Sequence, residues 1–443
     1  MKKSIFKAYD IRGKYPSEID GKIAFRIGRA IVEFLGKKSP NIVVGRDNRL
    51  SSPILSKKLK QGILIQGGNV IDISLATTPL LYFSVFHKKY DGGVSVTASH
   101  NSSCYNGFKI VREKAIPIGG KTGLKQIKEL TIKGKFKRTL KGKEFKKEFL
   151  KDYAEFNRSS FNFGEMKPFK IVIDTANAVP GIIISKVFEK TPFKIYPIFE
   201  KLIGSFPNHD PDPSIAKNLK YLQSQVKKRK ADLGIAFDGD GDRIIFIDEK
   251  GFVVRADLIL SLVSEILLKE KKGRKILYDI RSSNIVRETI KKNKGKAIMA
   301  RVGHSFIKAK MRKENIYFGG ELSGHYYFKK HYFCEAPLFV LFKVLEYLSS
   351  SEKPFSEAIK PFEKYYHSGE INFKVEDKKK KIKELEKKYK KGKISHLDGL
   401  RCDFNDWWFS VRPSNTEPFL RLVIEAKSKS LMEKKKREIK ESI

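Results

Sequence analysis

The chain has 443 residues, of which 40% are hydrophobic, and its 91 Lys and Arg against 50 Asp and Glu give a formal charge of +41. This apolar content excludes global disorder, and the length suggests about three domains at ~150 residues each. No apolar run reaches the ~18 residues of a membrane-spanning helix, and none near the start has signal-peptide length. The three cysteines form no Cys-x-x-Cys pair, which argues against a disulfide scaffold and a zinc site. We therefore expect an unprocessed cytoplasmic protein with no membrane partner.

The excess of basic residues raises the question of a nucleic-acid partner, since basic surfaces are typical of proteins that bind phosphate backbones. The densest basic run, residues 377–393, carries Ile382, Leu385 and Tyr389 on one face of a predicted helix. The sequence has no helix-turn-helix, zinc-finger or basic–aromatic stacking motif. We therefore interpret the charge as dispersed surface lysine and expect no nucleic-acid partner.

Apolar strands alternate with helical segments through the first 110 residues. Ser-Ser-Pro at 51–53 and Thr-Thr-Pro at 77–79 supply a cap and a proline for the first helical turn. The alternation predicts a βαβαβ unit with parallel strands. We expect strands at 41–45, 70–73 and 93–97 and helices at about 51–66 and 77–90.

The same alternation recurs twice further along the chain. The second round has predicted strands at 169–174, 193–198 and 232–237, and the third has them at 275–279, 297–302 and 316–318. The tail from Gly399 to Ala426 has short strands with turns, and a basic amphipathic helix closes the chain. We predict three related mixed-sheet α/β domains plus a C-terminal α+β domain, with boundaries at 1–148, 149–250, 251–362 and 363–443.

A polar cluster, Thr97-Ala98-Ser99-His100-Asn101, follows a strand of the first domain at its carboxyl end. Open α/β sheets bind their ligands at such ends. Ser99 beside His100 could be a nucleophile with a base, whereas Ser-His-Asn would also make an ordinary helix cap. The sequence lacks the Gly-x-Ser-x-Gly elbow of an α/β-hydrolase.

Aspartate alternates with glycine after the strand at 232–237, in Asp238-Gly239-Asp240-Gly241-Asp242-Arg243. Carboxylates at i, i+2 and i+4 on an extended loop can converge on one hard cation, and without it they would repel one another. An EF-hand is excluded because Arg243 stands where that loop needs glycine, and because the segment follows a strand. The pattern predicts a Mg²⁺ site, with Arg243 beside it to bind a phosphate.

A third cluster, Gly319-Gly320-Glu321-Leu322-Ser323-Gly324-His325, follows the strand at 316–318. Its Glu, Ser and His suit the hydroxyls of a sugar, with His325 able to move protons. An ordinary turn remains an equal alternative.

The fourth cluster is Arg412-Pro413-Ser414-Asn415-Thr416-Glu417-Pro418. Its arginine, hydroxyls, amide and turn N–H groups could form a phosphate nest. A plain hairpin turn would have the same composition.

Together the four clusters resemble, in order and separation, the motifs of the α-D-phosphohexomutase family over essentially the whole chain. Ala8-Tyr9-Asp10-Ile11-Arg12-Gly13 is similar to the opening of the phosphomannomutase/phosphoglucomutase branch, and the phosphoglucosamine mutases usually have Gly at the position of Asn415. The resemblance implies an intramolecular phosphotransferase that interconverts hexose 6-phosphate and hexose 1-phosphate, of mannose, glucose or both. It also implies an active site in a central cleft.

The resemblance further implies that Ser99 is carried as phosphoserine and passes its phosphoryl group to the sugar. A hexose 1,6-bisphosphate would form, reorient and return its other phosphate to Ser99. Mg²⁺ would be held by Ser99, Asp238, Asp240 and Asp242. The implied cofactors are therefore Mg²⁺ and the bisphosphate activator, the partners are small sugar phosphates, and we expect a monomer or weak dimer.

By the same resemblance, His100, Lys109 and Arg243 join Ser99 in catalysis. A larger set is expected to bind substrate: Tyr9, Arg12, Arg281, His304, Glu321, Ser323, His325, Arg412, Ser414, Asn415 and Thr416. Two positions depart from the family pattern. Asn101-Ser102-Ser103-Cys104 lacks the prolines that many relatives have after Asn, and Arg281 stands where some relatives have Lys.

Three alternatives follow from the sequence. A phosphoglucosamine mutase is the alternative within the same family. A phosphotransferase or phosphatase could use an aspartate of the Asp-Gly loop as nucleophile. A nucleic-acid-binding module would explain the charge and leave the motifs unexplained.

Overall fold

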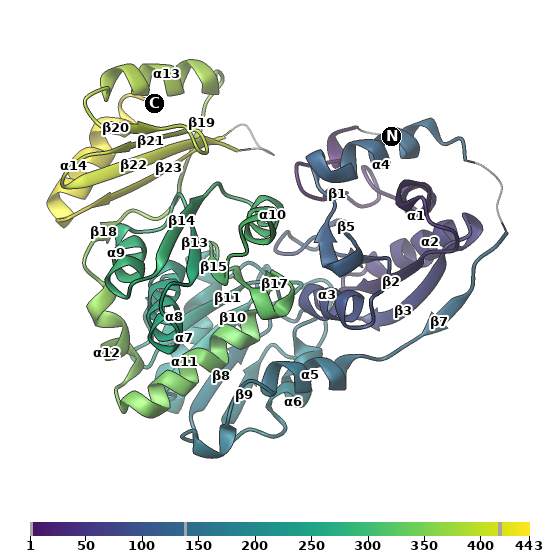
Figure 1. Cartoon of the computed structure of the whole chain (residues 1–443), viewed down its shortest axis with the longest axis horizontal. Helices are drawn as coiled ribbons and strands as arrows, with labels where there is room; N and C mark the ends of the chain where they lie inside the picture. Colours follow the sequence, from purple (N-terminus) through teal and green to yellow (C-terminus); the bar gives the residue numbers. More distant parts are fainter. Residues whose placement is uncertain (1–2, 137–139, 415–418) are drawn as a thin grey trace. The chain divides into compact units, whose positions relative to one another are not determined.

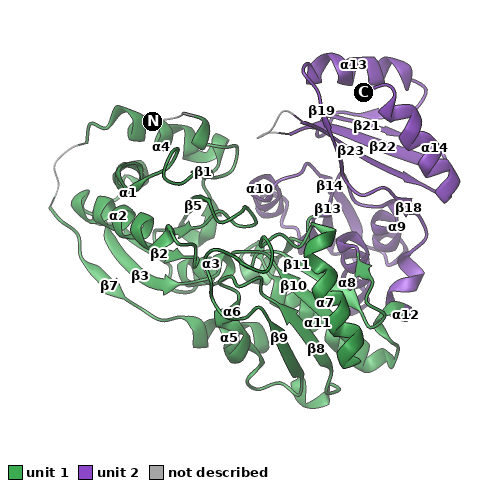
Figure 2. Ribbon diagram, turned by 180° about the vertical axis from the view of Figure 1, so that it is seen from behind, with its two compact units in different colours: residues 1–254, 323–356 green, residues 255–322, 357–443 purple. Residues whose placement is uncertain are grey.

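The computed structural model of the chain describes residues 3–136, 140–414 and 419–443 (Figure 1). The chain forms two compact units, Met1–Val254 with Ser323–Ser356 and Arg255–Leu322 with Glu357–Ile443 (Figure 2). The predicted architecture of α/β domains followed by an α+β domain is confirmed. The four predicted domain boundaries remain a prediction.

The first sheet of the first unit has the strand order β1-β5-β4-β2-β3-β7, with β6 beside β5. The predicted βαβαβ unit is confirmed, but the sheet is not wholly parallel, because β5 runs antiparallel to both β1 and β4. The elements are β1 (Ile11–Lys14), α1 (Gly21–Leu35), β2 (Asn41–Arg46), α2 (Ser52–Ile65), β3 (Asn69–Leu75), α3 (Thr78–His87), β4 (Gly92–Val96), β5 (Tyr105–Arg112), β6 (Ile116–Pro117), α4 (Lys125–Lys133) and β7 (Glu144–Lys146), with helical turns η1 (Lys3–Ile5), η2 (Glu113–Ala115) and η3 (Gly120–Leu124).

The second sheet has the order β12-β11-β10-β8-β9, in which β8 is parallel to β9 and β10 while β11 is antiparallel to its neighbours. The predicted strands at 169–174, 193–198 and 232–237 are confirmed as β8, β9 and β10. Its elements and the helices around it are α5 (Leu150–Arg158), η4 (Phe163–Glu165), β8 (Lys170–Asp174), α6 (Gly181–Phe188), β9 (Lys194–Ile198), α7 (Ala216–Arg229), β10 (Leu233–Phe237), β11 (Ile244–Asp248) and β12 (Val253–Val254). The chain later returns to the first unit with β16 (Tyr326–Phe328), η5 (Lys329–His331), β17 (Cys334–Glu335) and α11 (Pro337–Ser351). β16 and β17 pair antiparallel with each other and are not strands of the second sheet.

The second unit contains the parallel strands β14-β13-β15 and a C-terminal antiparallel sheet of order β18-β23-β22-β21-β20, with β19 also beside β23. The strand predicted at 316–318 begins two residues later than expected, as β15 at Phe318. The elements are α8 (Ala256–Glu270), β13 (Lys275–Asp279), α9 (Asn284–Lys292), β14 (Lys296–Ala300), α10 (His304–Glu314), β15 (Phe318–Gly320), η6 (Lys360–Phe362), β18 (Tyr366–His367), β19 (Ile371–Lys374), α13 (Lys378–Lys388), β20 (Lys393–Ser395), β21 (Leu400–Asp403), β22 (Trp407–Pro413), β23 (Phe419–Ala426) and α14 (Lys429–Lys440); α12 (Phe355–Ile359) contains the junction at Ser356.

Local sequence explains where several elements begin and which face they bury. Asp20 caps α1 by accepting a hydrogen bond from Ile23 N at 2.8 Å, and Gly36 ends the helix with φ +62°. In the basic helix α13, Leu385 is fully buried against the C-terminal sheet. The predicted apolar face of a lysine-rich surface helix is therefore confirmed.

Two of the exclusions made from the sequence have structural counterparts. None of the helices in the described residues is long and apolar enough to cross a membrane. Cys104, Cys334 and Cys402 are all free thiols, so no disulfide joins them.

Candidate active site

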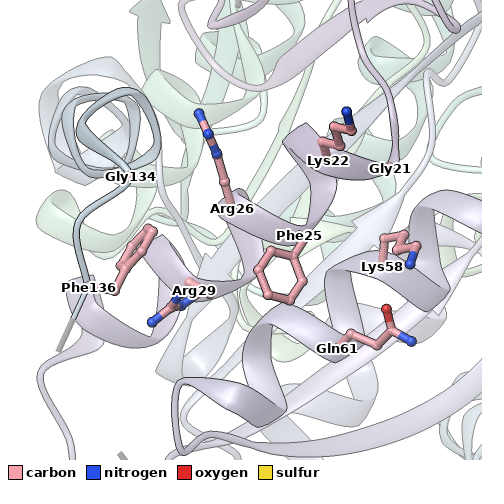
Figure 3. Close-up of a pocket in the computed structure, with 9 residues that line it drawn as sticks. All are labelled: Gly21, Lys22, Phe25, Arg26, Arg29, Lys58, Gln61, Gly134 and Phe136. Atoms are coloured by element: carbon pink, nitrogen blue, oxygen red, sulfur yellow. The ribbon is translucent and has the colours of Figure 1, made fainter. Parts of the chain in front are cut away.

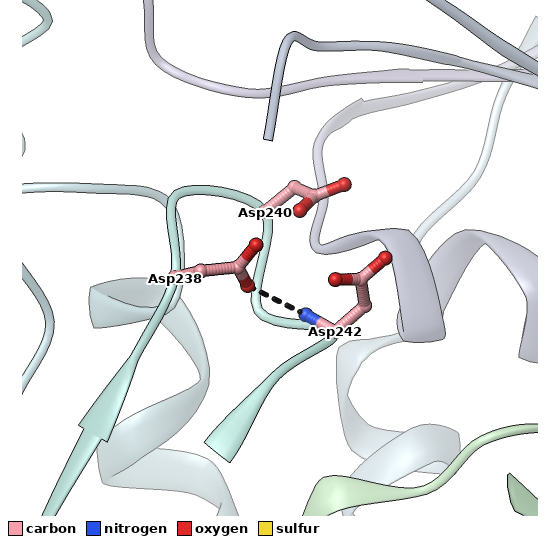
Figure 4. Close-up of side chains that lie close together, drawn as sticks. All are labelled: Asp238, Asp240 and Asp242. Atoms are coloured by element: carbon pink, nitrogen blue, oxygen red, sulfur yellow. Dashed lines mark hydrogen bonds between the residues drawn. The ribbon is translucent and has the colours of Figure 1, made fainter. Parts of the chain in front are cut away.

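The Asp-Gly loop connects β10 to β11 in the first unit and brings its three carboxylates together. Asp238, Asp240 and Asp242 are each at most 1% exposed, and their ligating oxygens lie within 4.8 Å of one another (Figure 4). Asp238 Oδ1 accepts from Asp242 N at 3.1 Å and Arg243 N at 3.2 Å. Gly241 has φ +70°, a conformation that residues with a side chain rarely adopt. The alternation of aspartate and glycine thus allows the tight loop that buries the carboxylates.

Ser99 follows β4 and faces this loop. Its hydroxyl donates to Asp238 Oδ2 at 2.6 Å, and its backbone N–H donates to Thr97 Oγ1 at 2.9 Å. Its φ of +51° is a left-handed conformation, which is strained for a residue other than glycine. At Gly239, a Cβ would lie 2.4 Å from the Ser99 carbonyl oxygen, so only glycine allows this approach of the two loops. The first two predicted clusters, 139 residues apart, are therefore in contact.

Lys109 lies on β5, opposite Ser95 of β4, and reaches the same aspartates. Its Nζ is 2.6 Å from Asp240 Oδ2 and 2.5 Å from Asp242 Oδ2. Burial favours the neutral amine, but the charges of Asp240 and Asp242 outweigh it and raise the pKa of Lys109. Lys109 is therefore a buried cation among carboxylates.

Burial and charge also shift the pKa values of three other groups. Burial, reinforced by the negative charges of Asp242 and Asp240, raises the pKa of Asp238 well above its usual range. Burial acts in the same direction on Asp242, but the charges of Lys109 and His325 hold its pKa well below that range. Burial and the charge of Arg243 lower the pKa of His100, whose Nδ1 lies 3.4 Å from Ser99 Oγ. His100 is therefore neutral at pH 7.

The aspartate cluster fits a hard divalent cation. Asp240 Oδ1 is buried and has no hydrogen-bond partner among the described residues, although each oxygen of a buried carboxylate normally has one. Carboxylate oxygens at this mutual distance are the ligands that Mg²⁺ prefers. The residue types, their burial and the orphaned oxygen therefore agree with the predicted metal site.

Arg243 and His325 extend the cluster within the first unit. Arg243 Nε lies 3.4 Å from His325 Nε2 and 3.9 Å from Asp238 Oδ2. His325 Nε2 is 3.2 Å from Asp242 Oδ1, and its Nδ1 is 2.9 Å from the hydroxyl of Ser323. The predicted sugar-binding residues Ser323 and His325 thus adjoin the predicted metal ligands.

Tyr9 and Arg12 belong to the segment around β1. Arg12 is hydrogen-bonded to Asn101 Oδ1 in the Ser99 loop and pairs with Asp10 at 2.6 Å. Tyr9 is partly buried two residues before β1 begins. The structure therefore joins Arg12 to the Ser99 loop.

The remaining predicted substrate residues lie in the second unit, where arginines surround Glu370. Glu370 Oε2 accepts from Arg412 at 2.8 Å and from Arg281 at 3.2 Å, and Oε1 accepts from Arg421 at 3.2 Å. Burial would raise the pKa of Glu370, but the charges of these arginines lower it to about 2. Arg281 also pairs with Asp279 at 2.6 Å. The second unit thus contains a partly buried cluster in which three guanidinium groups share one ionised Glu.

Glu321, His304 and Ser414 complete the predicted residues of the second unit. Glu321 Oε1 accepts from Gly303 N at 3.0 Å, directly before His304 at the start of α10, and lies 3.8 Å from Arg281. Ser414 is buried, and its N–H donates to the carbonyl of Phe419 at 2.8 Å. Asn415 and Thr416 lie outside the described residues.

Sequence reasoning missed some side chains that contact these clusters. Thr78 belongs to a predicted helix start, yet its hydroxyl donates to Asp240 Oδ2 at 2.6 Å. Glu370 belongs to no motif and precedes an ordinary strand. Arg421 lies opposite Arg412 on the neighbouring strand, which only the pairing of β22 with β23 reveals.

A separate pocket of about 370 Å³ lies in the first unit (Figure 3). It contains none of the predicted site residues. Its lining comprises Gly21, Lys22, Phe25, Arg26, Arg29, Lys58, Gln61, Gly134 and Phe136.

Comparison with known proteins agrees with this geometry. Four domain families match in order: phosphoglucomutase/phosphomannomutase alpha/beta/alpha domain I over residues 3–138, domain II over 147–251, domain III over 255–365 and the C-terminal domain over 370–442. A phosphomannomutase of Vibrio cholerae is 38% identical, covering 95% of this chain and 94% of its own. A phosphomannomutase of Methanocaldococcus jannaschii is 39% identical, covering 99% and 97%.

A solved structure has the same fold over the whole chain. The phosphoglucomutase/phosphomannomutase family protein of Burkholderia thailandensis superposes with a TM-score of 0.92 at 30% identity, covering 100% of this chain and 97% of its own. The resemblance inferred from the four motifs is confirmed. The chain belongs to the phosphoglucomutase/phosphomannomutase family and is a hexose-phosphate mutase.

Proposed function

We propose that this enzyme interconverts the 6-phosphates and 1-phosphates of mannose, glucose or both through a phosphoserine at Ser99. The contact that carries the proposal is the hydrogen bond from Ser99 Oγ to Asp238 Oδ2, at 2.6 Å, inside a buried cluster of three aspartates and one lysine. A hydroxyl in a strained turn beside such a cluster is suited to phosphoryl transfer, which depends on positioning and on stabilising charge. The names of the V. cholerae and M. jannaschii relatives favour mannose phosphates.

In the proposed reaction, the phosphate on Ser99 passes to the free hydroxyl of a hexose monophosphate. The bond from phosphorus to Ser99 Oγ breaks, a bond from phosphorus to the sugar oxygen forms, and the proton of the sugar hydroxyl ends on Ser99 Oγ. In the second transfer the bond from the other phosphorus to its sugar oxygen breaks, and a bond from that phosphorus to Ser99 Oγ forms. Neutral His100, 3.4 Å from Ser99 Oγ, is able to accept the proton that the Ser99 hydroxyl then loses, and the released sugar oxygen takes up a proton in its place.

Charged side chains would stabilise the transferring group. Lys109 is protonated and buried at the aspartates, and Arg243 lies beside Asp238. Both can oppose the negative charge that develops on a phosphoryl group in transit. Asp238, Asp240 and Asp242 would hold Mg²⁺ together with an oxygen of Ser99. When bound, this ion neutralises charge on the transferring phosphate.

The other predicted residues divide between sugar and phosphate. We propose that His304, Glu321, Ser323 and His325 bind sugar hydroxyls, and that Tyr9 and Arg12 contact the substrate near Ser99. Arg281, Arg412, Ser414, Asn415 and Thr416 would bind the phosphate that is not transferred. Guanidinium groups suit this role because they pair with phosphate through two parallel hydrogen bonds.

We propose that the enzyme works in the cytoplasm on small-molecule substrates, as a monomer or weak dimer with no nucleic-acid or membrane partner. Its three free cysteines fit a reducing compartment. Hexose 1,6-bisphosphate would serve as activator, because an enzyme whose Ser99 has lost its phosphate needs a phosphoryl donor.

The test is replacement of Ser99 by Ala, with Ser103→Ala in the same loop as the control. We expect turnover to fall by at least about 10³-fold in Ser99→Ala and to change little in the control. Coupled assays with the 1-phosphates of mannose, glucose and glucosamine, run in parallel, rank the substrates. A preference for glucosamine 1-phosphate would instead indicate a phosphoglucosamine mutase.

Intact mass distinguishes the nucleophiles. The wild-type protein should carry the mass of one phosphoryl group, which Ser99→Ala lacks and which survives acid, because phosphoserine is acid-stable. A phosphoryl group that persists in Ser99→Ala and is lost in acid would indicate an aspartyl phosphate and contradict the proposal.

A further inference from the structure

Arg49 is a fully buried arginine between β2 and α2, and every N–H of its guanidinium group is hydrogen-bonded. Its exposed fraction is 0%. Nη2 donates to the carbonyls of Ser99 and Asn101, each at 2.6 Å, and Nη1 to those of Ser102 at 2.6 Å and Tyr105 at 3.2 Å. A guanidinium group has five N–H donors. Four of them bind one loop, the segment 99–105 that contains Ser99.

The fifth donor fixes the orientation of the group. Arg49 Nε donates to Asp47 Oδ2 at 3.0 Å, while Asp47 Oδ1 accepts from Arg49 N at 3.0 Å and from the hydroxyl of Ser52. The guanidinium also lies over the ring of Phe206, 5.0 Å from its centroid. Arg49 therefore has a single orientation, set by Asp47.

The Ser99 loop needs this support because it has few bonds of its own. Within 98–105, the backbone bonds are those from Asn101 N to the carbonyl of Ala98 and from Tyr105 N to that of Ser102, both at 3.1 Å. Ser99 holds a strained left-handed conformation, and Ser102 and Ser103 stand where prolines would have restricted the chain. Without Arg49 the carbonyls of Ser99 and Asn101 would lose this donor, which is most costly for the carbonyl of the buried Ser99.

We propose that Arg49, oriented by Asp47, is the positioning residue of the phosphoryl-carrying loop and sets where Ser99 Oγ lies against Asp238. The inference rests on the proposed role of Ser99. Its hydrogen bonds to the loop all go to backbone carbonyls, so Arg49 acts through the loop and governs the transfer step more than the binding of substrate. A displacement of about 1 Å at a reacting group lowers a rate by about 10²-fold.

Arg49→Lys tests the inference. Lysine keeps the charge but has one nitrogen on a flexible stem, which cannot reach four carbonyls and Asp47 together. We expect kcat, and the rate at which a hexose 1,6-bisphosphate phosphorylates Ser99, to fall by about 10²-fold, with KM changed less than about threefold. Amide hydrogens of residues 98–106 should exchange faster, while those of β2 and β4 should not.

Arg158→Lys is the matched control. Arg158 also lies in the first unit and binds two backbone carbonyls, those of Lys186 and Val187, but contacts no predicted site residue. The Arg158→Lys variant should lose some stability and keep the kcat of the wild-type protein. An equal fall of kcat in both variants, per folded molecule, would show a general effect of lost packing and would overturn the inference.

Asp47→Asn provides a second test that leaves Arg49 in place. Both oxygens of Asp47 accept from N–H groups of Arg49, so the amide NH₂ of asparagine must face a donor in either orientation. We expect the same pattern as in Arg49→Lys: lower kcat, little change of KM and faster exchange in 98–106. Unchanged exchange of these amides and unchanged kcat in either folded variant would contradict the proposal.

The two proposals fail in different ways. A wild-type protein with no phosphate on Ser99 and no mutase turnover contradicts the proposed function, whatever the variants do. Normal wild-type turnover with normal Arg49→Lys turnover contradicts only the role of Arg49.

Discussion

Around Ser99, neighbouring side chains set the protonation state of each ionisable group. Lys109 stays cationic because two aspartates adjoin it, and His100 stays neutral because it is buried beside Arg243. The pKa values of Asp238 and Asp242 shift in opposite directions although the two residues are only four positions apart, since only Asp242 has both Lys109 and His325 as neighbours. The chemistry of each group therefore follows from its immediate contacts and not from its residue type.

His331 shows the same principle away from the site and leads to a prediction about pH. It is buried among Phe156, Phe328 and Phe339, and burial, aided by the charge of Lys330, lowers its pKa to about 3. In the unfolded chain its pKa returns to about 6.5. Below that pH the unfolded state binds a proton that the folded state does not, so stability falls as the pH is lowered.

His331→Gln should remove this contribution. Between pH 7.5 and pH 5, the free energy of unfolding should fall by about 2 kcal/mol more in the wild-type protein than in the variant. Urea unfolding at the two pH values measures the difference. Equal falls in both proteins would show that His331 is not the group responsible.

At the scale of elements, two glycines bring α1 and α2 into backbone contact. A Cβ on Gly28 would lie 2.2 Å from the carbonyl oxygen of Leu59, and one on Gly62 would lie 2.0 Å from that of Phe25. Neither glycine has an unusual φ, so the close approach alone requires them. This contact packs together the two helices that connect β1 to β2 and β2 to β3 along the chain.

Gly62→Ala should therefore destabilise the protein even though alanine favours helix. The backbones must move apart, which costs about 1–3 kcal/mol, against a gain in helix propensity of at most ~1 kcal/mol. We expect the melting temperature to drop in calorimetry. Gly164→Ala, where the nearest heavy atom to a new Cβ is 3.5 Å away, is the control and should melt as the wild-type protein does.

At the scale of the whole molecule, we expect the charge of +41 to act on a small anion, the sugar-phosphate substrate. Five basic residues fall in the predicted motifs or beside them, namely Arg12, Lys109, Arg243, Arg281 and Arg412, and most of the others are dispersed on surfaces such as α13. A protein of high positive charge attracts a dianionic sugar phosphate over a range that salt shortens to ~10 Å at 0.1 M.

Salt should therefore weaken capture of substrate more than turnover. Between about 20 and 200 mM NaCl, at constant Mg²⁺, we expect kcat/KM to fall several-fold while kcat stays nearly constant. Steady-state assays across this range measure both. A kcat/KM that does not change with salt would show that the net charge plays no part in substrate capture.

Much of the fold could be predicted because its signals are local. Strands such as Asn41–Arg46 and Lys170–Asp174 are short apolar runs, and helices such as Thr78–His87 begin with a cap and a proline. β5 escaped prediction because Tyr105–Arg112 follows an irregular loop and mixes polar with apolar residues. Its antiparallel place between β1 and β4 depends on strands far away in the sequence.

By itself the sequence determined the family, the order of the α/β units and the residue types of the site, because motifs and periodicity are properties of neighbouring residues. Only the tertiary structure decided that Ser99 meets Asp238, that Lys109 pairs with two aspartates and that Arg49 binds the Ser99 loop. These contacts join residues that are 50 to 139 positions apart. Which such residues meet depends on strand order and on buried polar groups finding partners, and neither can be read from a local pattern.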